Sequence, residues 1–85
     1  MPLWSLATMG THASYLLDLG RLLREEADKA RETASGASAT EFERGQLFAF
    51  YRVLSLMQEQ AVAFDLALAD LSLDGLDPDR DLLRP

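Results

Sequence analysis

Few residues in this chain are of types that perform chemistry, and their spacing argues against a catalytic site. His12 is the only histidine and there is no cysteine, so neither a histidine cluster nor a thiolate site can bind a metal. A serine nucleophile needs a base beside it, and no glycine-flanked nucleophile turn accompanies the single histidine. We therefore expect a protein that is not an enzyme, with no catalytic residue, no metal and no cofactor.

Acidic residues near the C-terminus invite comparison with a calcium-binding loop. They are Asp74, Asp77, Asp79 and Asp81. An EF-hand loop requires glycine at its sixth position, and counting from Asp77 the sixth residue is Leu82. We therefore interpret residues 72–85 as a solvated acidic segment.

The weakest alternative function is that of an enzyme whose site forms at a dimer interface from carboxylate and guanidinium groups. The candidates are Glu25, Glu26, Arg44 and Arg52. No pair of them is forced together by its spacing, so no reaction follows from the pattern.

The charge balance restricts the partners. The chain has 85 residues and a net charge of −6, from 14 acidic and 8 basic side chains. No basic patch is available to neutralise phosphates, which disfavours nucleic acid and anionic membrane surfaces as partners. An acidic inhibitor of the immunity or antitoxin type, which masks a basic partner protein, remains an alternative function.

The strongest pattern is an apolar seam that predicts a long helix over residues 40–71. Its residues recur at alternating spacings of three and four, as in an unbroken heptad repeat. They are Leu47, Phe50, Leu54, Met57, Ala61, Phe64, Leu68 and Leu71. A second row runs beside the seam through Ala49, Val53, Leu56, Ala63 and Ala67, and Phe48, Tyr51 and Val62 add apolar surface on the flank.

Local signals define the start of this helix but leave two features of it open. Thr40 and Glu43 have the spacing of a capping box. Asp65 interrupts the spacing of polar residues along the helix, so the sequence leaves open whether the helix is kinked there. Gln60 shares the second row, and it is either a buried amide that fixes the register of a bundle or a solvated residue at its rim.

A first helix is predicted over residues 11–34, after an apolar leader at residues 1–10. Its apolar positions are Tyr15, Leu16, Leu19, Leu22, Leu23, Ala27, Ala30 and Ala34. Gly20 inside this pattern costs about 1 kcal/mol relative to alanine. We expect the close approach of another backbone to compensate for it.

Short connections complete an all-α architecture in a single domain over residues 1–85. Residues 35–39 have turn composition, and so short a linker between long helices favours an antiparallel hairpin. Asp77 and Pro78 suit the start of a short C-terminal turn or helix. We expect this turn to fold back on the hairpin through Leu73, Leu76, Leu82 and Leu83.

The width of the apolar surface predicts self-association. A monomeric core of this size is marginal, and the second helix needs neighbours on more than one side. We therefore predict a homodimer in which two hairpins form a four-helix bundle. The predicted interface consists of Phe48, Phe50, Tyr51, Leu54, Met57, Ala61, Val62 and Phe64.

These patterns favour a small non-catalytic interaction module, such as an adaptor, a regulator or an accessory chaperone. Its main partner is a second copy of the chain, and another protein, of basic character, is the alternative partner. The lack of cysteine is typical of a reducing cytoplasm, so we expect a cytoplasmic protein.

Overall fold

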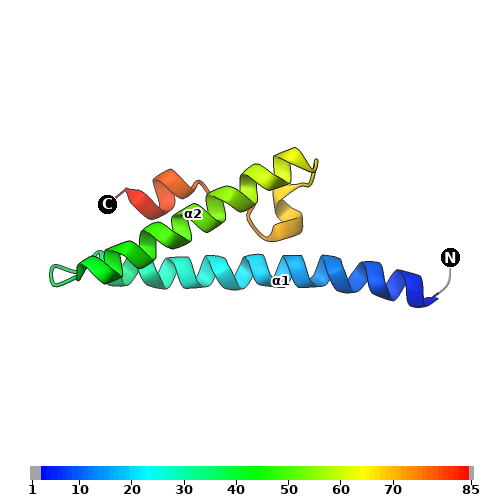
Figure 1. Ribbon diagram of the computed structural model, residues 1–85, viewed down its shortest axis with the longest axis horizontal. Coiled ribbons are helices and arrows are strands. Elements are labelled where there is room, and N and C mark those ends of the chain that lie inside the picture. The colour runs from blue at the N-terminus through cyan, green and yellow to red at the C-terminus, as the bar shows by residue number, and fades with distance from the viewer. Residues whose placement is uncertain (1–2, 85) are drawn as a thin grey trace.

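The computed structural model describes residues 3–84, with side chains from residue 10 onward. Over this range the chain forms helices and turns but no strand, in the order α1 (Leu3–Ala34), α2 (Glu41–Ala63), η1 (Leu68–Leu71) and η2 (Asp79–Leu83). The helices α1 and α2 form an antiparallel hairpin (Figure 1). The predicted all-α hairpin with a short C-terminal turn is confirmed.

The helix α1 begins earlier than the sequence predicts. Its backbone is helical from Leu3, so the predicted helix start near Thr11 is wrong. The predicted leader over residues 1–10 includes Met1 and Pro2, which lie outside the described residues, and it stays a prediction. No proline occurs between residues 3 and 34, and Gly10 alone does not stop a helix that good helix formers continue. The N-terminal part of α1 therefore extends past the end of α2 (Figure 1).

The helix α2 begins at the predicted capping box. The backbone N–H of Glu43 donates to Thr40 Oγ1 at 3.1 Å, and the Thr40 N–H donates in return to Glu43 Oε1 at 2.8 Å. These reciprocal hydrogen bonds satisfy two backbone donors that the first turn would otherwise leave open. They place the end of the inter-helix turn at the residue that the sequence indicated.

The helix α2 ends at Ala63, so the predicted continuation to residues 69–71 is wrong. Asp65 adopts a left-handed conformation with φ of 56°. The Asp65 N–H donates to the Val62 carbonyl at 3.1 Å and the Leu66 N–H donates to the Ala61 carbonyl at 2.8 Å. This pair of hydrogen bonds is a Schellman motif, and it turns the chain out of the helix.

Beyond this turn, η1 packs against α1 at Gly20. A Cβ atom at position 20 would collide with the backbone carbonyl of Leu71. The expected close approach of another backbone to Gly20 is confirmed. Because η1 lies between the two helices at this end, α2 diverges from α1 toward its C-terminus (Figure 1).

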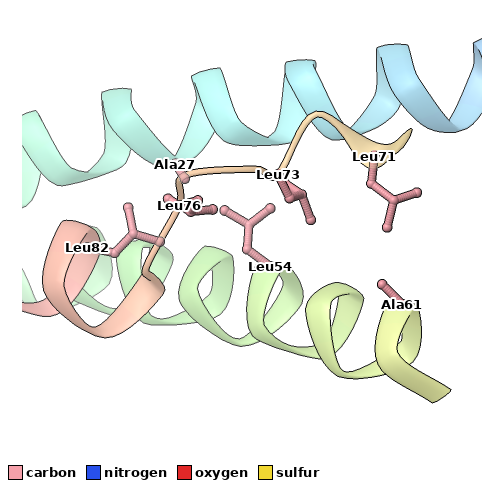
Figure 2. Packing of buried hydrophobic residues seen from close by; sticks show 7 residues of the cluster. All are labelled: Ala27, Leu54, Ala61, Leu71, Leu73, Leu76 and Leu82. Atoms are coloured by element: carbon pink, nitrogen blue, oxygen red, sulfur yellow. The ribbon is translucent and has the colours of Figure 1, made fainter. Parts of the chain in front are cut away.

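The buried core is small and draws heavily on the residues after α2. It contains Ala27, Leu54, Ala61, Leu71, Leu73, Leu76 and Leu82. Figure 2 shows the chain after Leu71 running between the two helices, with Leu73 and Leu76 near Leu54. The predicted return of the C-terminal leucines is confirmed for three of them, whereas Leu83 remains 43% exposed.

Candidate interaction surfaces

Residues 72–84, which we call the C-terminal strap, cover one flank of the hairpin. On α1 this flank is marked by residues seven apart, which lie on one side of a helix. Ser72 Oγ donates to the Leu17 carbonyl at 2.7 Å, and Arg31 Nη2 donates to the Arg84 carbonyl at 2.8 Å. Arg24, midway between them, donates through Nη1 to the carbonyls of Ser72 at 3.0 Å and Asp74 at 2.9 Å.

The strap also contacts α2 through two residues that are seven apart. Gln58 Nε2 donates to the Leu76 carbonyl at 2.9 Å in a partly buried position. A hydrogen bond with the Asp79 carboxylate raises the pKa of the Tyr51 phenol, because the phenolate would lie beside a negative charge. The strap is thus tied to both helices on the same flank of the hairpin.

Asp81 stabilises the last turn of the strap. Its carboxylate accepts hydrogen bonds from Arg80 Nε at 2.8 Å and from the Asp77 backbone N–H at 2.9 Å. The hydrogen bond from the Arg80 guanidinium, with that from the Asp77 N–H, lowers the pKa of Asp81 to about 2. The carboxylate is therefore ionised at neutral pH.

The opposite flank of α2 carries a row that no other part of the described chain covers. We call this row, at alternating spacings of four and three, the open face: Phe42, Gln46, Ala49, Val53, Leu56, Gln60 and Ala63. All seven residues are exposed, with Phe42 at 73%, Val53 at 41% and Leu56 at 43%. None is charged, so the row is a continuous apolar and amide surface that spans residues 42–63.

The open face is the second apolar row of the sequence, extended toward the N-terminus, with Gln60 included and without Ala67, which lies beyond the end of α2. Sequence reasoning missed Phe42 and Gln46, although both continue its spacing toward the N-terminus of α2. Gln60, whose environment the sequence left open, is exposed in the single chain. On α1, Leu19 and Leu22 lie on the flank away from the strap contacts, and Leu22 is 43% exposed.

The residues of the predicted dimer interface fall into three groups. Leu54 and Ala61 are buried in the core of the single chain. Phe50, Tyr51 and Met57 are half-buried against that core, and Phe48, Val62 and Phe64 are exposed. The rings of Phe48 and Tyr51 contact each other with centroids 5.6 Å apart. The assignment of these eight residues to a dimer interface stays a prediction.

The residues considered for an interfacial enzyme have separate partners. Glu25 accepts from Arg21 at 2.9 Å, and Glu26 lies 3.6 Å from the Lys29 ammonium. Arg44 donates to the Ala39 carbonyl at 3.0 Å, and Arg52 is exposed on α2. The structure does not bring the four residues together.

The described residues provide neither a metal-binding cluster nor a membrane-spanning helix. No group of three or more histidine, cysteine, aspartate or glutamate side chains within residues 10–84 is arranged to hold a metal ion. No helix over the described range combines the length and apolarity needed to cross a bilayer.

Comparison with known proteins identifies no relative of this chain. No protein-family model, curated protein or solved structure significantly matches the chain.

Proposed function

We propose that this protein is a small non-catalytic interaction module that acts as a homodimer, with two hairpins packed through their open faces into a four-helix bundle. The observation that carries the proposal is the asymmetry of the hairpin. The C-terminal strap covers one flank, whereas an uncharged row along the whole of α2 stays exposed on the other. Contiguous apolar surface of this kind marks an association site in soluble proteins.

The energetics of the open face favour a second copy as its cover. Complete burial of a large apolar side chain stabilises by about 1.5–3 kcal/mol, and each copy brings Phe42, Val53 and Leu56, all at least 41% exposed. Each copy also carries a net charge of −6, which opposes association. A contact row without any charged residue keeps the repelling groups away from the interface.

The sequence of the open face also indicates how two copies align. The row is nearly symmetric about Val53, because Gln46 and Gln60 are each seven residues from it. An antiparallel pairing with the two-fold axis at Val53 brings Gln46 level with Gln60 of the second copy. It also brings Ala49 near the level of Leu56, and Phe42 near that of Ala63, so that small side chains meet large ones and amides meet amides.

Cysteine cross-linking tests this alignment, because the chain has no cysteine of its own. We expect Val53→Cys to form a disulfide-linked dimer under mild oxidation. A mixture of Gln46→Cys and Gln60→Cys should cross-link, while either variant alone should not. Phe48→Cys is the control, since Phe48 is 55% exposed on α2 but lies outside the open face.

Sedimentation of the unmodified chain at micromolar concentration tests the dimer itself. A stable 9.4 kDa monomer would overturn the proposal. A dimer in which Phe48→Cys cross-links and Val53→Cys does not would move the interface to the flank that the sequence analysis predicted.

A second candidate function is an acidic inhibitor that masks a basic protein. The net charge of −6 supports this alternative. Affinity for such a partner should fall steeply with ionic strength, whereas dimerisation through an uncharged face should change little.

A further inference from the structure

A cleft lies outside the open face, at the end of the hairpin where α2 diverges from α1 (Figure 1). We call this end the splayed end, and the end with the inter-helix turn the closed end. The cleft has a volume of about 420 Å³ and lies between α1 and the chain around η1. Its lining is mostly apolar and includes Leu16, Leu17, Leu66 and Leu71, together with the carboxylate of Asp70. Leu16, Leu17 and Leu66 remain 39%, 47% and 44% exposed, so the chain leaves these walls partly uncovered.

A second hollow extends this apolar surface. It has a volume of about 180 Å³ and shares Leu16, Leu66 and Leu71 with the cleft. Across the shared leucines it adds Met57 and Phe64 near the end of α2, and its edge reaches Gln60 of the open face. Together the two hollows form an apolar strip of the kind that receives side chains from successive turns of a partner helix.

The charges around the cleft select the chemistry of that helix. Asp70 lines the cleft and forms no ion pair with any side chain in the described range. Arg21, which lines a neighbouring hollow together with Ser14 and Leu17, is already paired with Asp18 at 2.7 Å and with Glu25 at 2.9 Å. An apolar strip beside an unpaired carboxylate favours a ligand that brings a positive charge next to its apolar residues.

We propose that this cleft binds an amphipathic helix of a partner protein, through apolar side chains at helical spacing and a lysine or arginine that pairs with Asp70. A second copy fits this cleft less well than it fits the open face, because Asp70 stands in the wall and each copy is acidic. The inference builds on the proposed role as an interaction module, but it does not depend on the dimer.

Binding can be measured with an 18-residue peptide of leucine and lysine arranged as an amphipathic helix and carrying a fluorophore. Fluorescence anisotropy reports its affinity for the full chain. The matched peptide with glutamate in place of every lysine should bind at least about tenfold more weakly, since attraction to Asp70 becomes repulsion.

Three leucines of nearly equal exposure provide matched variants. Leu66 is 44% exposed in the cleft, Leu56 is 43% exposed on the open face, and Leu83 is 43% exposed at the far end of the strap. Leu66→Gln should weaken peptide binding about tenfold and leave sedimentation unchanged. Leu56→Gln should weaken the dimer but not peptide binding, and Leu83→Gln should change neither.

Charge reversal gives the second pair of variants. Asp70→Lys should weaken peptide binding about tenfold, whereas Asp28→Lys, at an exposed position on α1 remote from the cleft, should have little effect. Circular dichroism of each variant verifies that the helices remain folded.

The outcomes separate this inference from the proposed dimer. Equal binding by the two peptides, or binding that neither Leu66→Gln nor Asp70→Lys weakens, would overturn the cleft assignment while the dimer stands. Dissociation of the dimer by Leu66→Gln would also overturn it, because the cleft would then be occupied by the second copy. Loss of the dimer in Leu56→Gln with peptide binding retained would support both.

Discussion

The two ends of the hairpin are built by different means. At the closed end, residues 35–39 join the helices, and the Thr40–Glu43 capping box fixes the first turn of α2. At the splayed end, a Schellman motif at Asp65 stops α2 and η1 then lies between the helices against Gly20. Local hydrogen bonds alone thus determine the first end, whereas the second also depends on the contact of Gly20 with Leu71, 51 positions apart in sequence.

This difference teaches where apolar periodicity misleads. The heptad spacing continues from Leu47 to Leu71, yet only its first part lies on a continuous helix. Leu71 is buried as the seam requires, but it reaches the core from a 3-10 turn rather than from α2. Phe64, in the same seam, is 73% exposed, so the spacing predicted the burial of Leu71 but neither the exposure of Phe64 nor the end of α2.

The largest expected effect comes from filling the contact at the splayed end. Gly20→Ala should lower the free energy of unfolding by about 3 kcal/mol, because the new Cβ would displace the Leu71 backbone. Gly45→Ala is the matched control in α2, where no atom lies within 4 Å of the added Cβ, and it should stabilise by about 1 kcal/mol. Urea denaturation measures the free energy of unfolding of both variants. A higher free energy of unfolding in both would show that the contact between η1 and Gly20 does not form.

Removing the arginine that holds the strap should have the next largest effect. Arg24→Met should cost about 2 kcal/mol, since two carbonyls lose a charged donor. Arg21→Met removes a guanidinium from exposed ion pairs only and should change the free energy of unfolding little, because solvent screens such pairs. The rate of hydrogen exchange at the Leu73 amide should rise in Arg24→Met but not in Arg21→Met. Equal exchange rates in the two variants would mean that the leucines of the strap, and not Arg24, hold it in place.

At the closed end, removing the cap should have a smaller effect. Thr40→Ala should cost about 1 kcal/mol and lower the melting temperature without changing the oligomeric state. Ser38→Ala, in the preceding turn, is the control. An unchanged melting temperature in Thr40→Ala would mean that the capping box does not stabilise the start of α2.

Lowering the pH should destabilise the first turn of α2 and the last turn of the strap. We expect this effect on stability to be the smallest of the four. Hydrogen bonds from Thr40, its backbone N–H first, lower the pKa of Glu43, and the hydrogen bond from Arg80 lowers the pKa of Asp81 to about 2. A lowered pKa means that the stabilisation is complete above the ordinary value of 3.8 for Asp81 and is lost as the pH falls toward about 2. Thermal melts of the unmodified chain and Asp81→Asn should therefore differ at pH 6 and converge near pH 2, whereas a constant difference would exclude this linkage.

The sequence predicted the closed end well because its signals are local. Thr40, Glu43 and the small residues of the turn act within a few positions of one another, so their spacing carries the information. The early end of α2 could not be predicted in the same way, since Asp65 stands where glycine usually provides the left-handed residue of a Schellman motif. Gly20 did signal a close backbone, but nothing in the sequence identified Leu71 as that backbone.

The candidate surfaces were predictable only in part. The double apolar row predicted two sets of neighbours for α2, but it did not indicate which row α1 and the strap would cover. Leu54 and Ala61 were assigned to the dimer interface, and the single chain buries both. The position of the strap depends on Arg24 and Gln58 hydrogen bonds to backbone carbonyls, which no spacing along the chain reveals.

The long α1 helix also affects how this protein migrates. The described chain measures 56 × 21 × 17 Å, with a radius of gyration of 15.5 Å, whereas a compact domain of this length has about 12 Å. A rod experiences more friction than a sphere of equal mass, so a monomer would leave a sizing column early, at the volume of a larger globular protein. Elution volume alone would therefore imitate a dimer, and the mass must come from sedimentation equilibrium or light scattering.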